Sequence, residues 1–288
     1  MKVPLGVSRS YAELVNAWLD QFQAFIFETV LTGWGRNPVA FGSHNRHDSD
    51  FVNRRIAGIK IALEHKFAPD KLTPQIRKFS QRVETKNGEE FHRVIGIPAP
   101  NAGIKSQLDT FQDQNVALIK SLASDQIQDV RTLLEQAEVS AWRVEELRAK
   151  IQDRFDVAKS KADLIARDQV LKLNSQLTKT RQTNAGITRY IWTTSKDERV
   201  RPAHQDLEGT VQAWSDPPVV DDDGRTANPG EDYQCRCTAY PILDDVVDAN
   251  EPSRVPEVTG DSVDAMIRLA RKCKTPGVTF LARGRVIR

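Results

Sequence analysis

The chain has 288 residues, of which 39% are hydrophobic and 28% are charged, and its formal net charge is +2. This length is enough for more than one domain, and the composition is ordinary for a soluble protein. No apolar run approaches the ~20 residues that a membrane-spanning helix needs, so we expect no membrane protein. A net charge this small does not by itself indicate a nucleic-acid partner.

The first residues lack the uninterrupted apolar stretch of a secretory signal, which favours a cytoplasmic protein. The chain has three cysteines, an odd number, and two of them, Cys235 and Cys237, are one residue apart. This spacing argues against a disulfide framework and favours reduced thiols or metal ligands. A Cys-x-Cys disulfide would also be strained.

Residues 1–103 are predicted to mix helices with a hairpin. Apolar residues recur at helical spacing over 10–31, with Ser10 as the N-cap, and residues 51–67 form a second helix. Two runs with β-branched residues flank Asn87-Gly88, the preferred pair for a tight turn, and predict a β-hairpin over 78–98. The prolines and glycines of 98–103 mark a linker or corner.

Residues 104–183 contain neither proline nor glycine and are rich in helix-forming residues. One apolar stripe runs from Val116 to Ala137. A second runs from a Ser140 cap to Leu177 and predicts one long helix, or two helices joined by a kink. We interpret both stripes as core rather than as a cofactor site.

Residues 184–245 are predicted to form a small mixed module. Alternating side chains over 187–194 predict a strand, residues 208–230 a long surface loop, and residues 235–242 a short strand ended by Pro241. Residues 246–288 are predicted to be a linker, a short helix over 263–272 and a basic tail. The expected fold is therefore α+β, with a mostly helical N-terminal and middle region before the C-terminal module.

The tail carries four basic residues in its last fifteen, namely Lys274, Arg283, Arg285 and Arg288. Lysine and arginine are sufficient for phosphate contacts, so the tail is a candidate for contact with DNA. The same composition is typical of an ordinary solvated terminus, and this second interpretation is preferred.

His204, Cys235 and Cys237 are candidate zinc ligands. In an extended segment residues i and i+2 point to the same side, so both thiols can converge on one ion, with His204 arriving from the preceding loop. The candidates for a fourth ligand are Asp197, Asp206, Asp232, Cys273 and water. The alternative is that both thiols are small core residues and that His204 bonds locally, and both alternatives remain open.

Charged groups also gather over 197–201, beside His204 and Asp206. Such a group is suited to acid–base or phosphate chemistry, or equally to a solvated turn held by ion pairs. The sequence shows no associated nucleophile and no glycine-rich phosphate loop. We therefore do not expect an enzyme.

The order of these residues forms a longer pattern: an aromatic-x-Trp strand, Asp-x-Arg-x-Arg-x-x-His, a glycine, a proline-containing loop, Pro-Gly and Cys-Arg-Cys ending at a proline. The matching residues are Tyr190, Trp192, Thr194, Asp197, Arg199, Arg201, His204, Gly209, Pro229, Gly230, Cys235, Arg236, Cys237 and Pro241. Over about residues 110–243 the chain resembles the phage Mu F-like head morphogenesis proteins, the minor head proteins of tailed bacteriophages.

The resemblance implies a minor capsid protein of the virion head, assembled in the bacterial host cytoplasm. It implies partners among the portal and the major capsid or scaffolding proteins, and a role in procapsid assembly, DNA packaging or ejection. In this view Trp192 anchors the core, and Asp197, Arg199 and Arg201 order the following turn through arginine–carboxylate pairs. Gly209 and Arg236 complete the structural motif.

Two hypotheses from other classes compete with this one. The first is a metal-dependent hydrolase or nuclease that uses His204, Cys235, Cys237 and a water at an open zinc position. The second is a plain nucleic-acid-binding module, but the chain lacks the basic stripe with interleaved aromatic residues that such a module shows.

Overall fold

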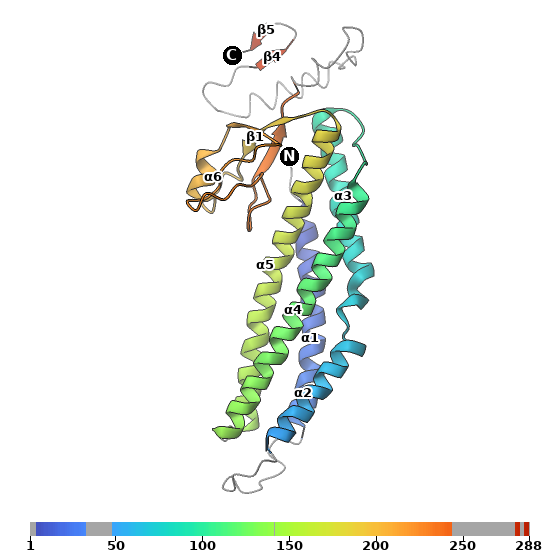
Figure 1. Ribbon diagram of the computed structural model, residues 1–288, viewed down its shortest axis with the longest axis vertical. Coiled ribbons are helices and arrows are strands. Elements are labelled where there is room, and N and C mark those ends of the chain that lie inside the picture. Colours follow the sequence, from blue (N-terminus) through green and yellow to red (C-terminus); the bar gives the residue numbers. More distant parts are fainter. Residues whose placement is uncertain (1–3, 33–47, 141, 244–279, 283–284, 288) are drawn as a thin grey trace. The chain divides into compact units, whose positions relative to one another are not determined.

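The computed structural model describes residues 4–32, 48–140, 142–243, 280–282 and 285–287 (Figure 1). The chain divides into two compact units. The helical unit comprises Val3–Asn87 and Gly103–Leu177, and the mixed unit comprises Gly88–Ala102 and Thr178–Arg288. The expected mostly helical α+β fold is confirmed. The sequence-based division at residues 103, 183 and 245 stays a prediction.

Among the described residues, six helical elements precede the first strand. They are α1 (Leu5–Leu31), α2 (Asp48–His65), the short 3-10 helix η1 (Pro69–Leu72), α3 (Thr73–Ile95), α4 (Ile104–Val139) and α5 (Val144–Asn184). None of the described helices is both long and apolar enough to cross a membrane.

The helical unit is an antiparallel bundle. Antiparallel pairing of α1 with α5 follows from two hydrogen bonds. Asn16 binds Asp163, and Gln23, which is later in α1, binds Gln152, which is earlier in α5. Lys161 on α5 forms an ion pair with Asp125 on α4. The elements α2, η1 and α3 follow one another along α4 and together take the place of one long helix. The bundle therefore consists of α1, this interrupted second helix, α4 and α5. The interruption begins after His65, where α2 ends, and Pro69 then begins η1.

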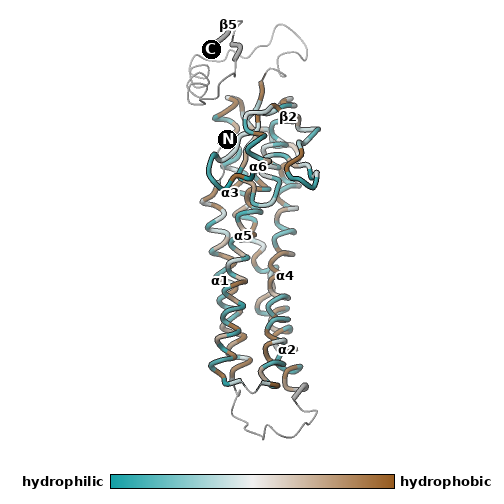
Figure 2. The backbone as a smooth tube through the Cα atoms, turned by 90° about the vertical axis from the view of Figure 1, so that its left-hand side faces the viewer, coloured by the Kyte–Doolittle hydropathy of each residue, from teal (hydrophilic) through white to brown (hydrophobic). Residues whose placement is uncertain are grey.

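The core of the helical unit is formed by apolar side chains from every helix. Figure 2 shows hydrophobic and hydrophilic stretches alternating along each helical tube, as expected for helices with one buried face. Val7, Phe22, Val130, Leu134 and Phe155 are among its fully buried members. The sequence-based interpretation of the 104–183 stripes as core is confirmed.

Buried polar groups interrupt this apolar core at defined places. Tyr11 donates a 2.7 Å hydrogen bond to Asn115, which in turn donates to the main-chain carbonyl of Phe111. Burial raises the pKa of Tyr11, so the phenol stays protonated and can donate. Because an unpaired buried polar group is costly, these bonds favour the register in which both groups are satisfied.

The predicted hairpin over 78–98 is wrong, because nearly all of these residues lie in α3. Ile76, Val83 and Phe91 form a buried stripe along the helix. The polar residues Ser80 and Asn87 are buried on the same stripe, so the helical spacing of apolar residues is not evident in the sequence. Asn87 is needed there because its amide donates to the main-chain and side-chain oxygens of Asn174.

Gly88 is explained by a close approach within the mixed unit. A Cβ at this position would lie 3.2 Å from Nη2 of Arg181, whose side chain is itself buried. The absence of a side chain, rather than the freedom to form a turn, accounts for this glycine.

Two predicted helix caps are also corrected. The first helix begins at Leu5, directly after Pro4, so Ser10 lies inside it and donates to the carbonyl of Gly6. Ser140 is the C-cap of α4 rather than the start of the next helix. The second stripe forms one 41-residue helix, α5, which settles the alternative left open by the sequence.

The mixed unit contains a three-stranded antiparallel sheet in the order β2-β1-β3. The strands are β1 (Arg189–Thr193), β2 (Val211–Ala213) and β3 (Thr238–Pro241), and the short helix α6 (Pro202–Asp206) follows β1. In the register, Trp192 of β1 lies opposite Ala239 of β3. The two strands predicted over 187–194 and 235–242 are confirmed.

The loop predicted over 208–230 is only partly a loop. Its first part forms β2, which pairs with β1, and Val219 pairs with Thr226 in an isolated bridge. Trp214, Val220 and Ala227 are buried in the core of the mixed unit. The turn residues of this segment are compatible with the predicted loop. Its apolar side chains do not alternate as they would in a strand, so the sequence did not predict their burial.

Gln182 connects the end of α5 to the sheet. Its side chain is fully buried, donates a 3.3 Å hydrogen bond to the carbonyl of Ala239 and accepts a 3.1 Å bond from the indole of Trp214. Both polar atoms of one buried amide are thereby satisfied, one by β3 and the other by the segment after β2.

The last described strands, β4 (Phe280–Ala282) and β5 (Arg285–Ile287), pair with each other in antiparallel fashion. The predicted linker, the helix over 263–272 and the tail residues Lys274, Arg283 and Arg288 lie outside the described residues.

Two valines of α4 provide a matched test of the bundle core. Val130 is fully buried and Val139 is 89% exposed. We expect Val130→Ala to lower the free energy of unfolding by about 2 kcal/mol, because it removes buried methyl groups and leaves a cavity. Val139→Ala should change it by less than about 0.5 kcal/mol. Urea unfolding followed by the helical circular dichroism signal measures both, and equal effects would contradict the bundle.

Candidate metal centre

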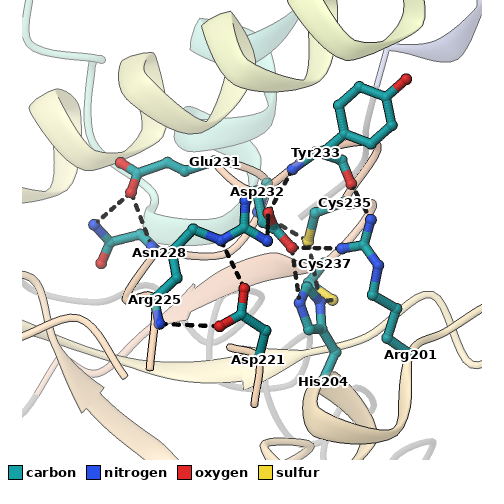
Figure 3. A network of polar contacts seen from close by, with 11 residues as sticks. Arg201, His204, Asp221, Arg225, Asn228, Glu231, Asp232, Tyr233, Cys235 and Cys237 are labelled. Carbon is teal, nitrogen blue, oxygen red and sulfur yellow. Dashed lines mark hydrogen bonds and ion pairs between the residues drawn. The ribbon is translucent and has the colours of Figure 1, made fainter. Parts of the chain in front are cut away.

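His204, Cys235 and Cys237 meet in the core of the mixed unit (Figure 3). The Sγ atoms of Cys235 and Cys237 each lie 3.5 Å from Nδ1 of His204. The three potential ligand atoms all lie within 4.8 Å of one another, and all three residues are buried. The structure thus brings together the three residues that the sequence singled out as zinc ligands.

Local backbone geometry explains how two distant segments meet. Pro202 occupies the first turn of α6, where its fixed φ is favourable, and His204 follows in that same turn. Before the cysteines, Gly230 and Gln234 both adopt positive φ, and the N–H of Cys235 bonds to the carbonyl of Asp232. The N–H of Gly230 points at the Cys235 sulfur at 3.4 Å.

Asp232 occupies the other side of the histidine ring. Its Oδ2 lies 3.3 Å from Nε2 of His204, and its carboxylate is completely buried. The same carboxylate receives Arg201 on Oδ2, and Arg225 lies 3.0 Å from Oδ1 (Figure 3). A buried negative charge is tolerated here because two guanidinium groups and one imidazole surround it.

A second ion pair joins the turn after β1 to the Cys-Arg-Cys segment. Arg236 donates to both carboxylate oxygens of Asp197, and the N–H of Arg199 donates to Oδ1 at 3.0 Å. The hydrogen bond from Arg236 is the main reason that the pKa of Asp197 falls from 3.8 to about 2. Arg199 itself is exposed and contributes through its backbone.

Trp192 and Gly209 support the cluster from β1 and from the end of the turn that carries α6. The indole of Trp192 is fully buried and meets the ring of His204 edge-on, with ring centroids 5.6 Å apart. Gly209 has a φ of +77° and donates to the carbonyl of Trp192 at 2.9 Å. A residue with a Cβ would be strained in that conformation, which accounts for the glycine.

Electrostatics separate the two thiols. The pKa of Cys235 is lowered, first because Cys237 donates a hydrogen bond to its sulfur and then because His204 also interacts with it. The pKa of Cys237 is raised by the same contact with Cys235 and by burial, while Trp192 acts in the opposite direction. The pKa of His204 is raised chiefly by Cys235. The pKa of Cys235 is thus shifted down and that of Cys237 up, so Cys235 is the more acidic thiol of the pair.

The other candidates for a metal ligand are placed elsewhere. Asp232 faces Nε2 of the histidine, whereas both sulfurs face Nδ1. Asp197 is engaged by Arg236, and Asp206 is exposed. Cys273 lies outside the described residues. Among the residues that the structure describes, no fourth His, Cys, Asp or Glu joins the group.

Several supporting residues had no distinctive sequence signal. Arg225 approaches Asp232 from the acidic loop, and Asn228 accepts a hydrogen bond from Tyr190 while Glu231 holds its amide. Asn228 and Glu231 flank Pro229-Gly230, which belongs to the sequence motif. Their partners became apparent only in the folded unit.

Residues 128–240 match the family model described as Phage Mu protein F like protein. These residues are a Mu F-like segment. The segment contains His204, Cys235 and Cys237, the ion pairs of Asp197 and Asp232, and the whole of β1. The match confirms the resemblance inferred from the motif.

One curated relative extends the comparison beyond this segment. A Haemophilus influenzae protein described as "Uncharacterized protein" is 36% identical over 146 residues, which cover 51% of this chain and 31% of the relative. The match thus spans about a third of that relative's length. No solved structure matches the chain.

The Asp197–Arg236 pair predicts a specific dependence on pH. A carboxylate whose pKa is lowered in the folded state adds stability above its unfolded pKa, and this stability is lost as the pH falls through the folded value. We therefore expect Arg236→Gln to destabilise the mixed unit at neutral pH, with the difference from the native chain shrinking between about pH 4 and about pH 2.

Urea unfolding followed by tryptophan fluorescence over this range measures the difference. Arg199→Gln is the matched control, because the exposed Arg199 side chain makes a smaller contribution to the pKa of Asp197. A penalty for Arg236→Gln that does not vary with pH would show that the ion pair is not its cause.

Proposed function

We propose that the protein is a minor head protein of a tailed bacteriophage that acts in head morphogenesis through contacts with other head components. The observation that carries this proposal is the Mu F-like segment, which contains the motif from Tyr190 to Cys237 that the sequence singled out. Within this proposal the protein is located in the virion head, and the portal is its principal partner, with the major capsid or scaffolding proteins beside it.

The helical unit supports a role in protein contacts. Val157 and Leu164 lie two turns apart on α5, and they are 65% and 44% exposed. Residues spaced by seven share one helix face, so these two side chains form a small, partly exposed apolar strip on α5. Contact between this strip and a neighbouring head protein is consistent with procapsid assembly.

Burial counts against the hydrolase or nuclease alternative. Cys235 and Cys237 are 4% and 5% exposed, and His204 is 2% exposed. Cys235, His204 and Asp232 stand in the order of a nucleophile, a base and an orienting carboxylate. A nucleophile or metal-bound water at this depth does not reach a macromolecular substrate without opening of the unit. We therefore propose a non-enzymatic role, while contact of the basic tail with packaged DNA stays a prediction.

Mass spectrometry of purified virions and procapsids tests the proposal. We expect the chain in procapsids at few copies per particle, with cross-links to the portal. Absence from both particles would contradict the assignment to the head, and cross-links confined to other head proteins would contradict the portal as principal partner.

Charge substitution on α5 tests the contact surface. We expect the double variant Val157→Asp, Leu164→Asp to reduce incorporation into procapsids at least several-fold while circular dichroism stays unchanged. Val139→Asp is the control, since Val139 is still more exposed but lies on α4. Normal incorporation of the double variant would show that this strip is not a contact surface.

A further inference from the structure

We propose that His204 Nδ1, Cys235 Sγ and Cys237 Sγ bind one structural zinc ion, with Asp232 as the outer partner that orients the histidine. This site does not depend on the assignment to a phage head. It rests on four features of the mixed unit: the separations of the three donors, the position of Asp232, the balance of charge and the burial of the cluster.

The donor separations fit zinc. Zinc bonds to thiolate sulfur at about 2.3 Å and to imidazole nitrogen at about 2.0–2.1 Å in a tetrahedral arrangement, so sulfur and nitrogen ligands of one ion lie about 3.5 Å apart. Both observed Sγ–Nδ1 separations are 3.5 Å. A single N–H at Nδ1 can donate a well-aligned hydrogen bond to only one of the two sulfurs. One zinc ion would bond to both sulfurs and to the nitrogen.

The position of Asp232 specifies which histidine nitrogen is available. A carboxylate beside Nε2 favours the tautomer that carries its proton there, which leaves the Nδ1 lone pair directed at the two sulfurs. Asp232 Oδ2 lies 3.3 Å from Nε2, and Arg201 and Arg225 hold the carboxylate in place. Histidine ligands of zinc commonly have a carboxylate partner of this kind.

The charges also favour a divalent cation. Two buried thiolates without a cation would add two negative charges next to Asp232, at a high desolvation cost. Zinc neutralises both thiolates and leaves Asp232 to its two arginines. The donor set of two sulfurs and one nitrogen selects zinc over magnesium or calcium, which prefer oxygen ligands.

A backbone group is also oriented toward one of the sulfurs. The N–H of Gly230 lies 3.4 Å from the Cys235 sulfur. Donors of this kind stabilise metal-bound sulfur, and the deep burial of the whole cluster indicates a structural rather than a catalytic ion.

The metal content of the purified full chain is the first test. We expect about one zinc per chain by mass spectrometry, and much less for Cys235→Ser, Cys237→Ser and His204→Ala. His92→Ala is the matched control, because His92 is an exposed histidine whose ring contacts the carbonyl of Ile97. Zinc retained by all three cluster variants would overturn the proposal, as would a folded native chain, prepared with zinc and without chelators, that carries no metal.

Ligand variants can fail to fold, so the native chain and Asp232→Asn supply independent measurements. X-ray absorption at the zinc edge should show two sulfur neighbours at about 2.3 Å. Asp232→Asn keeps all three ligands, and we expect it to bind zinc about 10- to 100-fold more weakly in competition with a chelator. A zinc shell without sulfur overturns the site, and an unchanged affinity in a folded Asp232→Asn chain overturns the role of Asp232.

Discussion

The buried carboxylate of Asp232 is the constraint on which the mixed unit depends. It receives Arg201 from the turn before α6, Arg225 from the acidic loop and the Nε2 side of His204 on α6 itself. A carboxylate in this position is tolerable only when all of these partners are present, because an unpaired buried charge costs several kcal/mol. The start of α6 and the acidic loop, which supply these partners, are therefore held together by one side chain.

The helical unit relies on a different balance. Its apolar core is extensive and draws on every helix of the unit. Tyr11 with Asn115, and Asn87 with Asn174, are buried pairs whose hydrogen bonds are satisfied in one register. Small polar contacts of this kind select one arrangement from many that bury similar area. A rigid bundle of long helices suits a protein that acts by presenting surfaces to neighbours.

The chemistry of the cluster is independent of the proposed role in the head. A thiol, an imidazole and a carboxylate in series are the parts of a nucleophilic site, but here all three are buried within a small core. The proposed zinc ion would use the imidazole and both thiols instead, with Asp232 and its two arginines behind the histidine ring. Small units with few apolar residues often gain their stability from such an ion.

Much of this protein was determined by local sequence. The helices of 104–183 were predicted because that stretch lacks proline and glycine, and His204, Cys235 and Cys237 were found because their residue types are metal ligands. Local patterns could not reveal that Asn87-Gly88 lies inside a helix, since their roles depend on Asn174 and Arg181, which are far away in the sequence. The same holds for Asp232: its residue type is visible in the sequence, but its position behind the histidine ring was decided by tertiary packing, because its partners come from segments that meet only after folding.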